Sequence, residues 1–401
     1  MISVAEARAR ILEPLHPLPP ETVALAAACG RVSAAPVIAR LTQPPADVSA
    51  MDGYAVRSAD GAAGARLGVV GSAPAGHPFA GRVERGGAVS IFTGSVVPSG
   101  ADAVVIQEDT TRDGDGVMLR EAAVAGRHIR RAGQDFSEGE TVIPPGRRLG
   151  PRDIGLAAAA NHPWLVVRRR PRVAILATGD EIALPGEPIP PGGIVSSNTH
   201  ALAALVRVAG GEPLVLPAVR DDRAMIAAAA EQASGADMLL TSGGASVGEH
   251  DLVQRALAER GLRVDFWQIA MRPGKPLMHG RLGTIPVLGL PGNPVSALVC
   301  AILFLLPALA RLSGLSADPL PTTPARLGGD LRANDRRADF LRGRLSRDAD
   351  GALVATAFPR QDSALVKLLA EADALILRPP HAPAAEAGAM VEVIRLDTLG
   401  V

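Results

Sequence analysis

Cysteine is scarce in this sequence. Only Cys29 and Cys300 occur among 401 residues, and neither has a set of cysteines and histidines close to it in the chain. This spacing suggests neither a disulfide framework nor a zinc site, which need several such residues at short intervals. We therefore expect a cytoplasmic protein.

The chain has no excess of charge of either sign. Lys+Arg and Asp+Glu both number 41, so the formal net charge is zero. Proteins that bind nucleic acid or a membrane surface depend on a basic footprint, so we expect neither of these partners. Aromatic residues make up only 2% of the chain, whereas hydrophobic residues make up 47%, which is typical of an alanine-rich globular protein with sizeable cores.

A hydrophobic run long enough to cross a bilayer is also missing. The longest one, Val295–Ala310, falls short of the required length of about 20 residues and contains Ser296 and Pro307. It predicts a buried core helix. The first fifteen residues include four charged side chains, which excludes the apolar segment of a secretory signal there.

The length predicts two to four domains, at about 150 residues each. Ser3 and Glu6 form a capping-box pattern at the start of a helix over residues 3–14. Short apolar runs between glycines and prolines over residues 67–143 predict a small β-rich domain. Residues 150–163 have the pattern of a helix, and the arginine run 168–170 after it predicts a solvated boundary.

The second half of the chain begins with alternating strands and helices. Between residues 172 and 315 this alternation predicts a parallel sheet with helices on both faces. A proline-rich linker follows, and the runs between residues 325 and 398 predict another β-rich module.

One glycine-rich turn in this region has the pattern of a phosphate-binding loop. The apolar run Met238–Leu240 predicts a central strand, residues 241–246 have only small side chains, and Asp251 opens a helix. Backbone N–H groups in such a turn bind anions, although an ordinary tight turn explains the two glycines equally well. Glu249 and Asp251 favour the phosphate loop, because carboxylates beside a bound phosphate imply a cation such as Mg²⁺.

Four polar turns follow predicted strands of the sheet. In parallel sheets, ligands bind at the carboxyl ends of the strands, where such turns converge. Any one of them could be purely structural, but together they predict a ligand site. The turns are residues 178–181, 242–244, 272–275 and 290–294.

Eight motifs in register resemble those of the molybdopterin molybdenumtransferase family, which includes the C-terminal domain of gephyrin. They are SAMDGYAVR, FTGSVVPSGADAVV, AGQDFSEGE, ATGDE, TSGGASVGEHD, RPGKP, LPGNPVSA and FPRQDSA. The resemblance covers nearly the whole chain. It implies an enzyme that inserts molybdate into adenylylated molybdopterin with Mg²⁺, releasing AMP and the molybdenum cofactor. It also implies an elongated homodimer that binds other cofactor-biosynthesis proteins.

The expected fold class is α/β and multidomain. A three-layer α/β/α domain with a mainly parallel sheet is joined by a small inserted β-rich domain, an N-terminal α-containing domain and a C-terminal β-barrel-like domain. The expected boundaries are residues 1–41 with 131–168 for the N-terminal domain, 42–130 for the inserted domain, 169–317 for the α/β domain and 318–401 for the last.

The chemistry of the implied reaction assigns roles to individual residues. A phosphoanhydride needs N–H donors and a divalent cation, and molybdate is a dianion that needs clustered cations on a stiff loop. In the family, the residues matching Asp52, Thr93, Asp135 and Ser363 are also linked to activity. The expected catalytic residues are Asp52, Thr93, Asp135, Glu181 and Asp251, and the expected metal ligands are Glu181, Asp221 and Asp251. The expected substrate-binding residues are Thr178, Ser242, Gly243, Gly244, Ser246, Arg272, Lys275, Pro291, Pro294 and Ser363.

The chain departs from the family pattern at two positions. Gln268 stands where relatives often have a lysine, so we leave it out of the site, and Arg272 stands where some have a lysine. Two other functions remain open. A molybdopterin adenylyltransferase would resemble residues 172–315 alone, and a scaffold would bind a partner protein without catalysis. The pattern does not distinguish molybdate from tungstate, which are nearly equal in size and charge.

Overall fold

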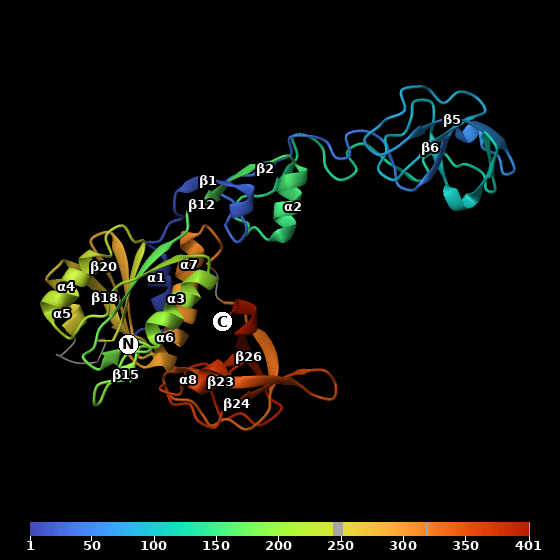
Figure 1. Ribbon diagram of the computed structural model, residues 1–401. Coiled ribbons are helices and arrows are strands. Elements are labelled where there is room, and N and C mark those ends of the chain that lie inside the picture. The colour runs from blue at the N-terminus through green and yellow to red at the C-terminus, as the bar shows by residue number, and fades with distance from the viewer. Residues whose placement is uncertain (244–251, 318–319, 401) are drawn as a thin grey trace. The chain divides into compact units, whose positions relative to one another are not determined.

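The computed structural model describes residues 1–243, 252–317 and 320–400 (Figure 1). The chain forms two compact units. Unit 1 consists of Met1–Glu21, Gly30–Ala34 and Val167–Val401, and unit 2 consists of Thr22–Cys29 and Ala35–Val166. β1 (Pro20–Ala24) and β12 (Trp164–Arg168) carry the chain from one unit to the other. The expected division into four domains stays a prediction.

Unit 1 contains a six-stranded sheet that is mainly parallel, as predicted. In spatial order its strands are β16 (Glu212–Val215), β13 (Arg172–Ala177), β17 (Met238–Ser242), β21 (Ile285–Leu290), β20 (Pro276–Leu282) and β18 (Leu262–Gln268). The first four run parallel, whereas β20 is antiparallel to both of its neighbours. All five residues of β17 are buried, because this strand lies inside the sheet with both faces covered.

Helices cover both faces of this sheet (Figure 1). Successive residues of β13 alternate between the two cores: Val173 and Ile175 belong to one, Ala174 and Leu176 to the other. The first core includes side chains of α1 (Val4–Leu12), α3 (Asn198–Val208), α6 (Pro294–Cys300) and α7 (Leu306–Leu312). The second includes side chains of α4 (Arg223–Glu231) and α5 (Leu252–Ala258). This is the predicted three-layer arrangement.

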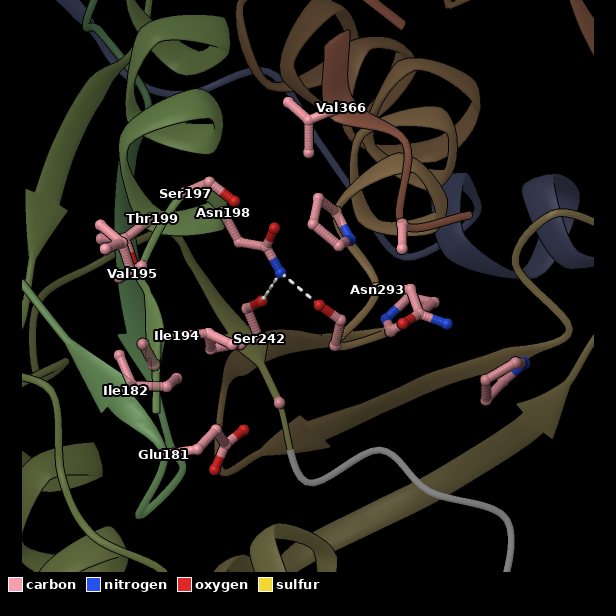
Figure 2. Close-up of a pocket in the computed structure, with 18 residues that line it drawn as sticks. Glu181, Ile182, Ile194, Val195, Ser197, Asn198, Thr199, Ser242, Asn293 and Val366 are labelled. Atoms are coloured by element: carbon pink, nitrogen blue, oxygen red, sulfur yellow. Dashed lines mark hydrogen bonds between the residues drawn. The ribbon is translucent and has the colours of Figure 1, made fainter. Parts of the chain in front are cut away.

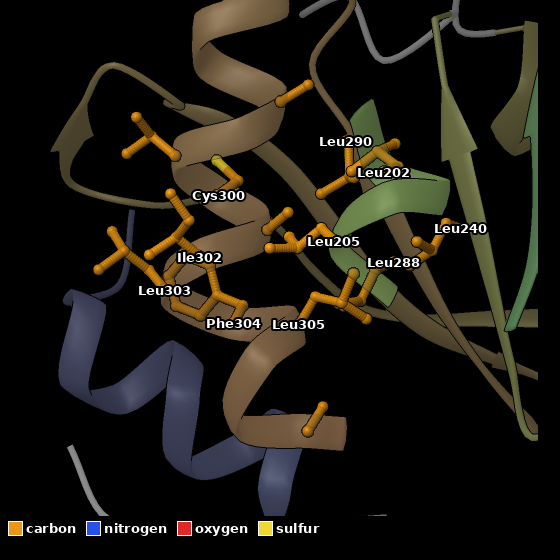
Figure 3. Close-up of a cluster of buried hydrophobic side chains, with 14 of the residues drawn as sticks. Leu202, Leu205, Leu240, Leu288, Leu290, Cys300, Ile302, Leu303, Phe304 and Leu305 are labelled. Atoms are coloured by element: carbon orange, nitrogen blue, oxygen red, sulfur yellow. The ribbon is translucent and has the colours of Figure 1, made fainter. Parts of the chain in front are cut away.

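The longest apolar segment of the chain is a core helix. α6 continues through a π-helical segment, Ala301–Leu305, into α7. The stretch Pro294–Leu312 is apolar and long enough to cross a membrane, but 78% of its most apolar window is buried inside the protein. Its side chains pack against α1, α3 and the sheet (Figure 3). The buried helix predicted from the sequence is therefore confirmed.

The start of α1 keeps half of the predicted capping box. Ser3 Oγ accepts a hydrogen bond from the backbone N–H of Glu6 at 3.1 Å. The Glu6 side chain does not complete the box but accepts a hydrogen bond from Arg10 at 2.6 Å. The helix therefore begins at the predicted residue with one capping bond and one pair of charges a turn apart.

The C-terminal part of unit 1 is a closed β-barrel. Its strands are β22 (Thr323–Leu327), β23 (Ala338–Arg347), β24 (Leu353–Ala357), β25 (Ala374–Arg378) and β26 (Met390–Arg395), with α8 (Val366–Ala370) between β24 and β25. The sheet closes because β23 pairs with both β24 and β25. β19 (Met271–Arg272) pairs with β23 in parallel, which joins the RPGKP loop to the barrel.

Unit 2 is β-rich, as predicted for its middle part. Its six-stranded sheet has the order β7 (Ala103–Ile106), β4 (Gly53–Val56), β6 (Gly87–Ile91), β5 (Arg66–Ala73), β9 (Gly116–Leu119) and β8 (Thr110–Asp113). Two short pairs accompany it, β2 (Val37–Ile38) with β11 (Thr141–Ile143) and β3 (Val48–Ser49) with β10 (Ile129–Arg130). α2 (Pro151–Ala159) ends just before Asn161, whose φ of +67° is incompatible with a continuing helix.

The arginine run 168–170 differs from its prediction as a solvated boundary. Arg169 donates two hydrogen bonds to Asp237, at 3.0 and 2.7 Å, and Asp237 also accepts from the backbone N–H of Arg172 at 2.7 Å. Arg168 donates to the carbonyl oxygen of Leu18 at 3.1 Å. Arg168 and Arg169 therefore form hydrogen bonds with other segments of the chain, Arg168 with Leu18 and Arg169 with Asp237 just before β17.

Candidate functional site

A cavity of about 810 Å³ lies at the carboxyl edge of the unit 1 sheet (Figure 2). Its lining includes residues at or just after the ends of β13, β17 and β21, together with Ala364 and Val366, just before and at the start of α8. It is lined by Ala177, Glu181, Ile182, Ile194, Val195, Ser196, Ser197, Asn198, Thr199, Ser242, Gly243, Pro276, Pro291, Gly292, Asn293, Pro294, Ala364 and Val366. Three of the four predicted turns contribute directly, and the fourth contributes through the adjoining Pro276.

One amide group ties two of these turns together. Nδ2 of Asn198 donates to Ser242 Oγ and to the carbonyl oxygen of Gly292, both at 2.8 Å (Figure 2). Ser242 ends β17, and Gly292 follows β21. The predicted residues Ser242, Pro291 and Pro294 therefore lie around a residue that our sequence analysis did not single out.

Gly243 is required by a close approach between two turns. Its φ is +99°, and a Cβ atom at this position would lie 2.3 Å from the carbonyl oxygen of Thr178. Only glycine fits both conditions. Thr178 is 1% exposed, and its hydroxyl has no hydrogen-bond partner among the described residues. Gly244, Ser246, Glu249 and Asp251 lie outside the described residues.

Helix starts and apolar side chains complete the wall. α3 begins at Asn198, and the unpaired N–H groups of a first helical turn attract anions. At the start of α6, the N–H of Val295 donates to the carbonyl oxygen of Ser363 at 3.1 Å. Ser363 thus takes part through its backbone. Ile182, in β14 (Ile182–Ala183), and β15 (Ile194–Val195) line the cavity with apolar side chains (Figure 2).

Carboxylates gather beside the cavity. The pKa of Asp221 is raised, first by partial desolvation and then by the charges of Asp180 and Glu181. The backbone N–H of Asp221 donates to Asp180 Oδ1 at 3.4 Å, and Glu181 lines the cavity. Within the described ranges no group of three metal-binding side chains is assembled. The predicted ligand Asp251 lies outside those ranges, so the metal site stays a prediction.

Arg272 and Lys275 differ in their surroundings. Arg272 donates two hydrogen bonds to Asp339, at 2.9 and 2.6 Å, and this contact raises its pKa. The carboxylate of Asp339, on β23 of the C-terminal barrel, thus balances the charge of Arg272. Lys275 is half-buried next to the lining residue Pro276 and has no ion pair in the described part of the chain. The role of both residues in oxyanion binding remains a prediction, and it is better supported for Lys275.

Two of the three predicted residues of unit 2 lie together. The backbone N–H and the hydroxyl of Thr93 both donate to Asp52 Oδ1 at 2.7 Å. These bonds lower the pKa of Asp52, the one from the hydroxyl most. Asp135 is held separately, through a hydrogen bond from its N–H to the carbonyl oxygen of Gln43 at 3.0 Å. All three side chains are exposed.

Asn198 and Arg342 were not among the site residues predicted from the sequence. Arg342 on β23 is 1% exposed, and its Nη2 donates to the carbonyl oxygen of Asp362 at 2.9 Å. Its backbone N–H also donates to Gln361 at 3.0 Å, so it fixes the segment that carries Ser363 and Ala364 to the cavity. A signal was present for Arg342, an arginine within the strand FLRGRL, whereas Asn198 had only its place at the start of an apolar helix, which does not reveal its partners.

Three family profiles match the chain. "MoeA N-terminal region (domain I and II)" matches residues 2–161, and "Probable molybdopterin binding domain" matches residues 174–311. "MoeA C-terminal region (domain IV)" matches residues 324–396. The second match spans the sheet and most of the residues that line the cavity.

Similar proteins cover the same length. Molybdopterin molybdenumtransferase 2 of Mycobacterium tuberculosis (strain ATCC 25618 / H37Rv) is 37% identical over 405 residues, covering 98% of this chain and 99% of the relative. Molybdopterin molybdenumtransferase of Nostoc sp. is 38% identical over 335 residues, covering 81% and 77%. The crystal structure of the molybdopterin biosynthesis moea protein from Pyrococcus horikosii has a TM-score of 0.84 and 31% identity, covering 98% and 99%. The chain belongs to the molybdopterin molybdenumtransferase family.

Proposed function

We propose that this protein transfers molybdenum from molybdate to adenylylated molybdopterin in a Mg²⁺-dependent reaction and releases AMP and the molybdenum cofactor. One observation carries the proposal: a cavity at the carboxyl edge of the sheet is lined by hydrogen-bond donors and by Glu181, which belongs to a group of carboxylates with Asp180 and Asp221 beside the cavity. The donors suit a phosphoanhydride and the carboxylates suit a divalent cation. The names of the relatives, molybdopterin molybdenumtransferase, support the transfer of molybdenum to a molybdopterin substrate.

Different groups of described residues bind different parts of the substrates. The hydroxyl of Ser242 and the N–H groups at the start of α3 bind the anionic part of the adenylylated substrate. The apolar side chains of Ile182, Ile194 and Val195 contact a flat ring of the same substrate. Lys275 lacks an acidic partner among the described residues and lies beside the cavity, where it binds the molybdate dianion.

Glu181 and Asp221 fit a bound Mg²⁺, together with the predicted ligand Asp251. The pKa of Asp221 is raised first by partial desolvation and then by repulsion from Asp180 and Glu181, and a bound divalent cation would offset both effects. Mg²⁺ prefers such oxygen ligands and would offset the negative charge of the phosphoanhydride. Three further residues keep the surrounding turns in place: Gly243, Ser363 and Thr178, whose hydroxyl is buried. Arg272, Gly244 and Ser246 complete the proposed set of binding residues.

The remaining proposals concern the assembly. We propose a cytoplasmic homodimer of four-domain chains, and we assign Asp52, Thr93 and Asp135 to the active site on the family resemblance. The exposed Asp52 carboxylate, held by Thr93 and ionised, is suited to contact a substrate or a cation. Contacts with other cofactor-biosynthesis proteins follow from the same resemblance.

The two alternatives are less well supported. Residues 174–311 alone would account for a molybdopterin adenylyltransferase, but family matches extend to residues 2–161 and 324–396 as well. A scaffold without catalysis would have no need for carboxylates beside a cavity or for Lys275, which has no acidic partner among the described residues.

The decisive experiment measures AMP release by the purified protein from adenylylated molybdopterin. We expect release only when molybdate and Mg²⁺ are both supplied. Release without molybdate would contradict a molybdenum transferase, and no release under any condition would favour the scaffold. Formation of adenylylated molybdopterin from ATP and molybdopterin would favour the adenylyltransferase.

A further inference from the structure

The side-chain amide of Asn198 uses both of its hydrogens inside the cavity wall. One goes to Ser242 Oγ and the other to the carbonyl oxygen of Gly292, each at 2.8 Å (Figure 2). Because a carbonyl oxygen only accepts, the orientation of the amide is fixed by the contact with Gly292. Asn198 therefore joins the turn after β17 to the turn after β21, which are 44 and 94 residues away from it in the sequence.

This contact has a consequence for Ser242. A serine hydroxyl has one hydrogen to donate and lone pairs that accept. Asn198 donates to one of these lone pairs, and no hydrogen bond among the described residues uses the hydrogen of Ser242. Ser242 is 3% exposed and lines the cavity, so an acceptor bound in the cavity can receive its remaining hydrogen. A hydroxyl prepared in this way binds an acceptor such as a phosphate oxygen.

We infer that Asn198 is a positioning residue that sets the spacing of the two turns and keeps the Ser242 hydroxyl as a donor to the anionic part of the ligand. The inference rests on the proposed function for the identity of that anion, the phosphate of the adenylylated substrate. It assigns Asn198 no contact with reacting atoms. The amide acts through Ser242 and Gly292.

The test is a double-mutant cycle with AMP as the probe. The dissociation constant of AMP is measured by calorimetry for the wild type, Asn198→Ala, Ser242→Ala and the double variant. Each single change should weaken binding roughly tenfold, as expected for hydrogen bonds to a charged group. The double variant should have nearly the same AMP dissociation constant as the single variant that binds AMP less tightly, because both changes act on the same donor. Independent losses that multiply to about a hundredfold would overturn the inference.

Ser3→Ala is the matched control for folding. Ser3 is also a polar residue at a helix start, but it lies outside the cavity lining. Its replacement should lower the melting temperature slightly and leave AMP binding unchanged. If Asn198→Ala alters only the melting temperature in the same way, Asn198 is merely structural and the inference fails.

Asn198→Asp gives a readout that a general loss of packing would not. Its ionised carboxylate would face the Gly292 oxygen and would take the hydrogen of Ser242, so AMP binding at neutral pH should be weaker than in Asn198→Ala. Lowering the pH towards the carboxyl pKa, about 4 in the unperturbed state, should restore part of the affinity. Glu181 is the titratable residue among the described residues of the cavity lining. His200 and Arg207 lie on α3, Lys367 lies on α8 and Glu371 follows it, so the wild-type pH profile serves as the reference.

Failure of this inference is separable from failure of the proposed function. A wild type that releases AMP with molybdate and Mg²⁺, together with an Asn198→Ala variant of unchanged KM and kcat, would overturn the positioning role alone. A wild type that never releases AMP would instead refute the proposed function. AMP binding by calorimetry would still report on the cavity in that case.

Discussion

Arg342 and Asp362 are joined by a hydrogen bond from a buried guanidinium group to a backbone carbonyl oxygen, 2.9 Å long. Burial lowers the pKa of Arg342, and the charge of Asp362 opposes that effect. Nε of Arg342 has no partner among the described residues. A side chain that is costly to bury therefore holds the segment that brings Ala364 to the cavity.

Arg342→Met tests whether the buried arginine serves the cavity more than the fold. Methionine keeps most of the volume and removes the charge, so we expect the free energy of unfolding to change by less than about 1.5 kcal/mol. AMP affinity should fall several-fold, because the segment 361–364 loses the guanidinium bond to the Asp362 carbonyl oxygen and keeps only the bonds between Gln361 and the backbone of residue 342. Arg344→Met is the control, since Arg344 lies on the same strand but is exposed and paired with Glu371. An equal loss of affinity in both variants would contradict this role.

Gly243→Ala should disrupt the cavity through a clash and not only through backbone strain. A Cβ atom would lie 2.3 Å from the Thr178 carbonyl oxygen, so the turns after β13 and β17 must separate. Gly235→Ala is the control, because Gly235 also has a positive φ, +84°, but has open space around its Cβ position.

Urea unfolding should show a loss of about 1–2 kcal/mol for Gly235→Ala, the cost of left-handed backbone alone, and a larger loss for Gly243→Ala. AMP binding should be lost only in Gly243→Ala. Equal effects of the two changes would show that the close approach to Thr178 has no importance for the site.

Mg²⁺ should stabilise the protein through the carboxylates near Asp221. A ligand that binds only the folded state raises the melting temperature. Adding MgCl₂ should therefore raise it in the wild type, and less in Asp221→Asn or Glu181→Gln. Sodium chloride at equal ionic strength corrects for general screening. An unchanged shift in both variants would place the cation elsewhere.

The effect of Asp221→Asn on the melting temperature should depend on pH with a definite sign. The folded-state pKa of Asp221 is raised, so the folded protein holds this proton more tightly than the unfolded chain does. Ionisation of Asp221 therefore reduces stability as the pH rises above the ordinary aspartate range. Without Mg²⁺, Asp221→Asn should melt slightly higher than the wild type at pH 7, and the difference should vanish at low pH. The effect is small because Asp221 is exposed and solvent screens the repulsion.

Lys275 should act on molybdate use more than on nucleotide binding. The chain has only two lysines, so Lys275→Gln has a natural control in Lys367→Gln, whose side chain is 89% exposed. We expect the molybdate concentration for half-maximal AMP release to rise about tenfold in Lys275→Gln, as expected for loss of a charged hydrogen bond. The AMP dissociation constant should stay the same. Equal loss of AMP affinity would assign Lys275 to the nucleotide.

The sequence predicted elements whose signals are local. β17, the helix Pro294–Leu312 and the turns after the strands follow from apolar runs, glycines and prolines within short windows. Asn198 was missed because its two partners are 44 and 94 residues away, and nothing in its neighbourhood reveals them. The balance of charge at Arg272 was missed for the same reason, since Asp339 lies 67 residues later.

The arginine run 168–170 shows the opposite error. Charged runs are usually solvated, and that general tendency gave the prediction. Arg169 instead forms an ion pair with Asp237, the residue just before β17, and the pair is partly shielded from solvent. Whether a charged run faces water is decided by what folds against it, and that information lies in another part of the chain.

The pairing of β19 with β23 has a consequence for synthesis on the ribosome. Arg272 is translated 67 residues before Asp339, and Ala364, which lines the cavity, comes later still. At about 5–20 residues per second, a nascent chain carries an incomplete cavity for several seconds after its main sheet has emerged. During that interval, the Arg272 guanidinium and the apolar start of α6 are open to chaperones. Truncation between α7 and β23 would keep the helices that cover the sheet but would remove Ala364 and Val366, which line the cavity.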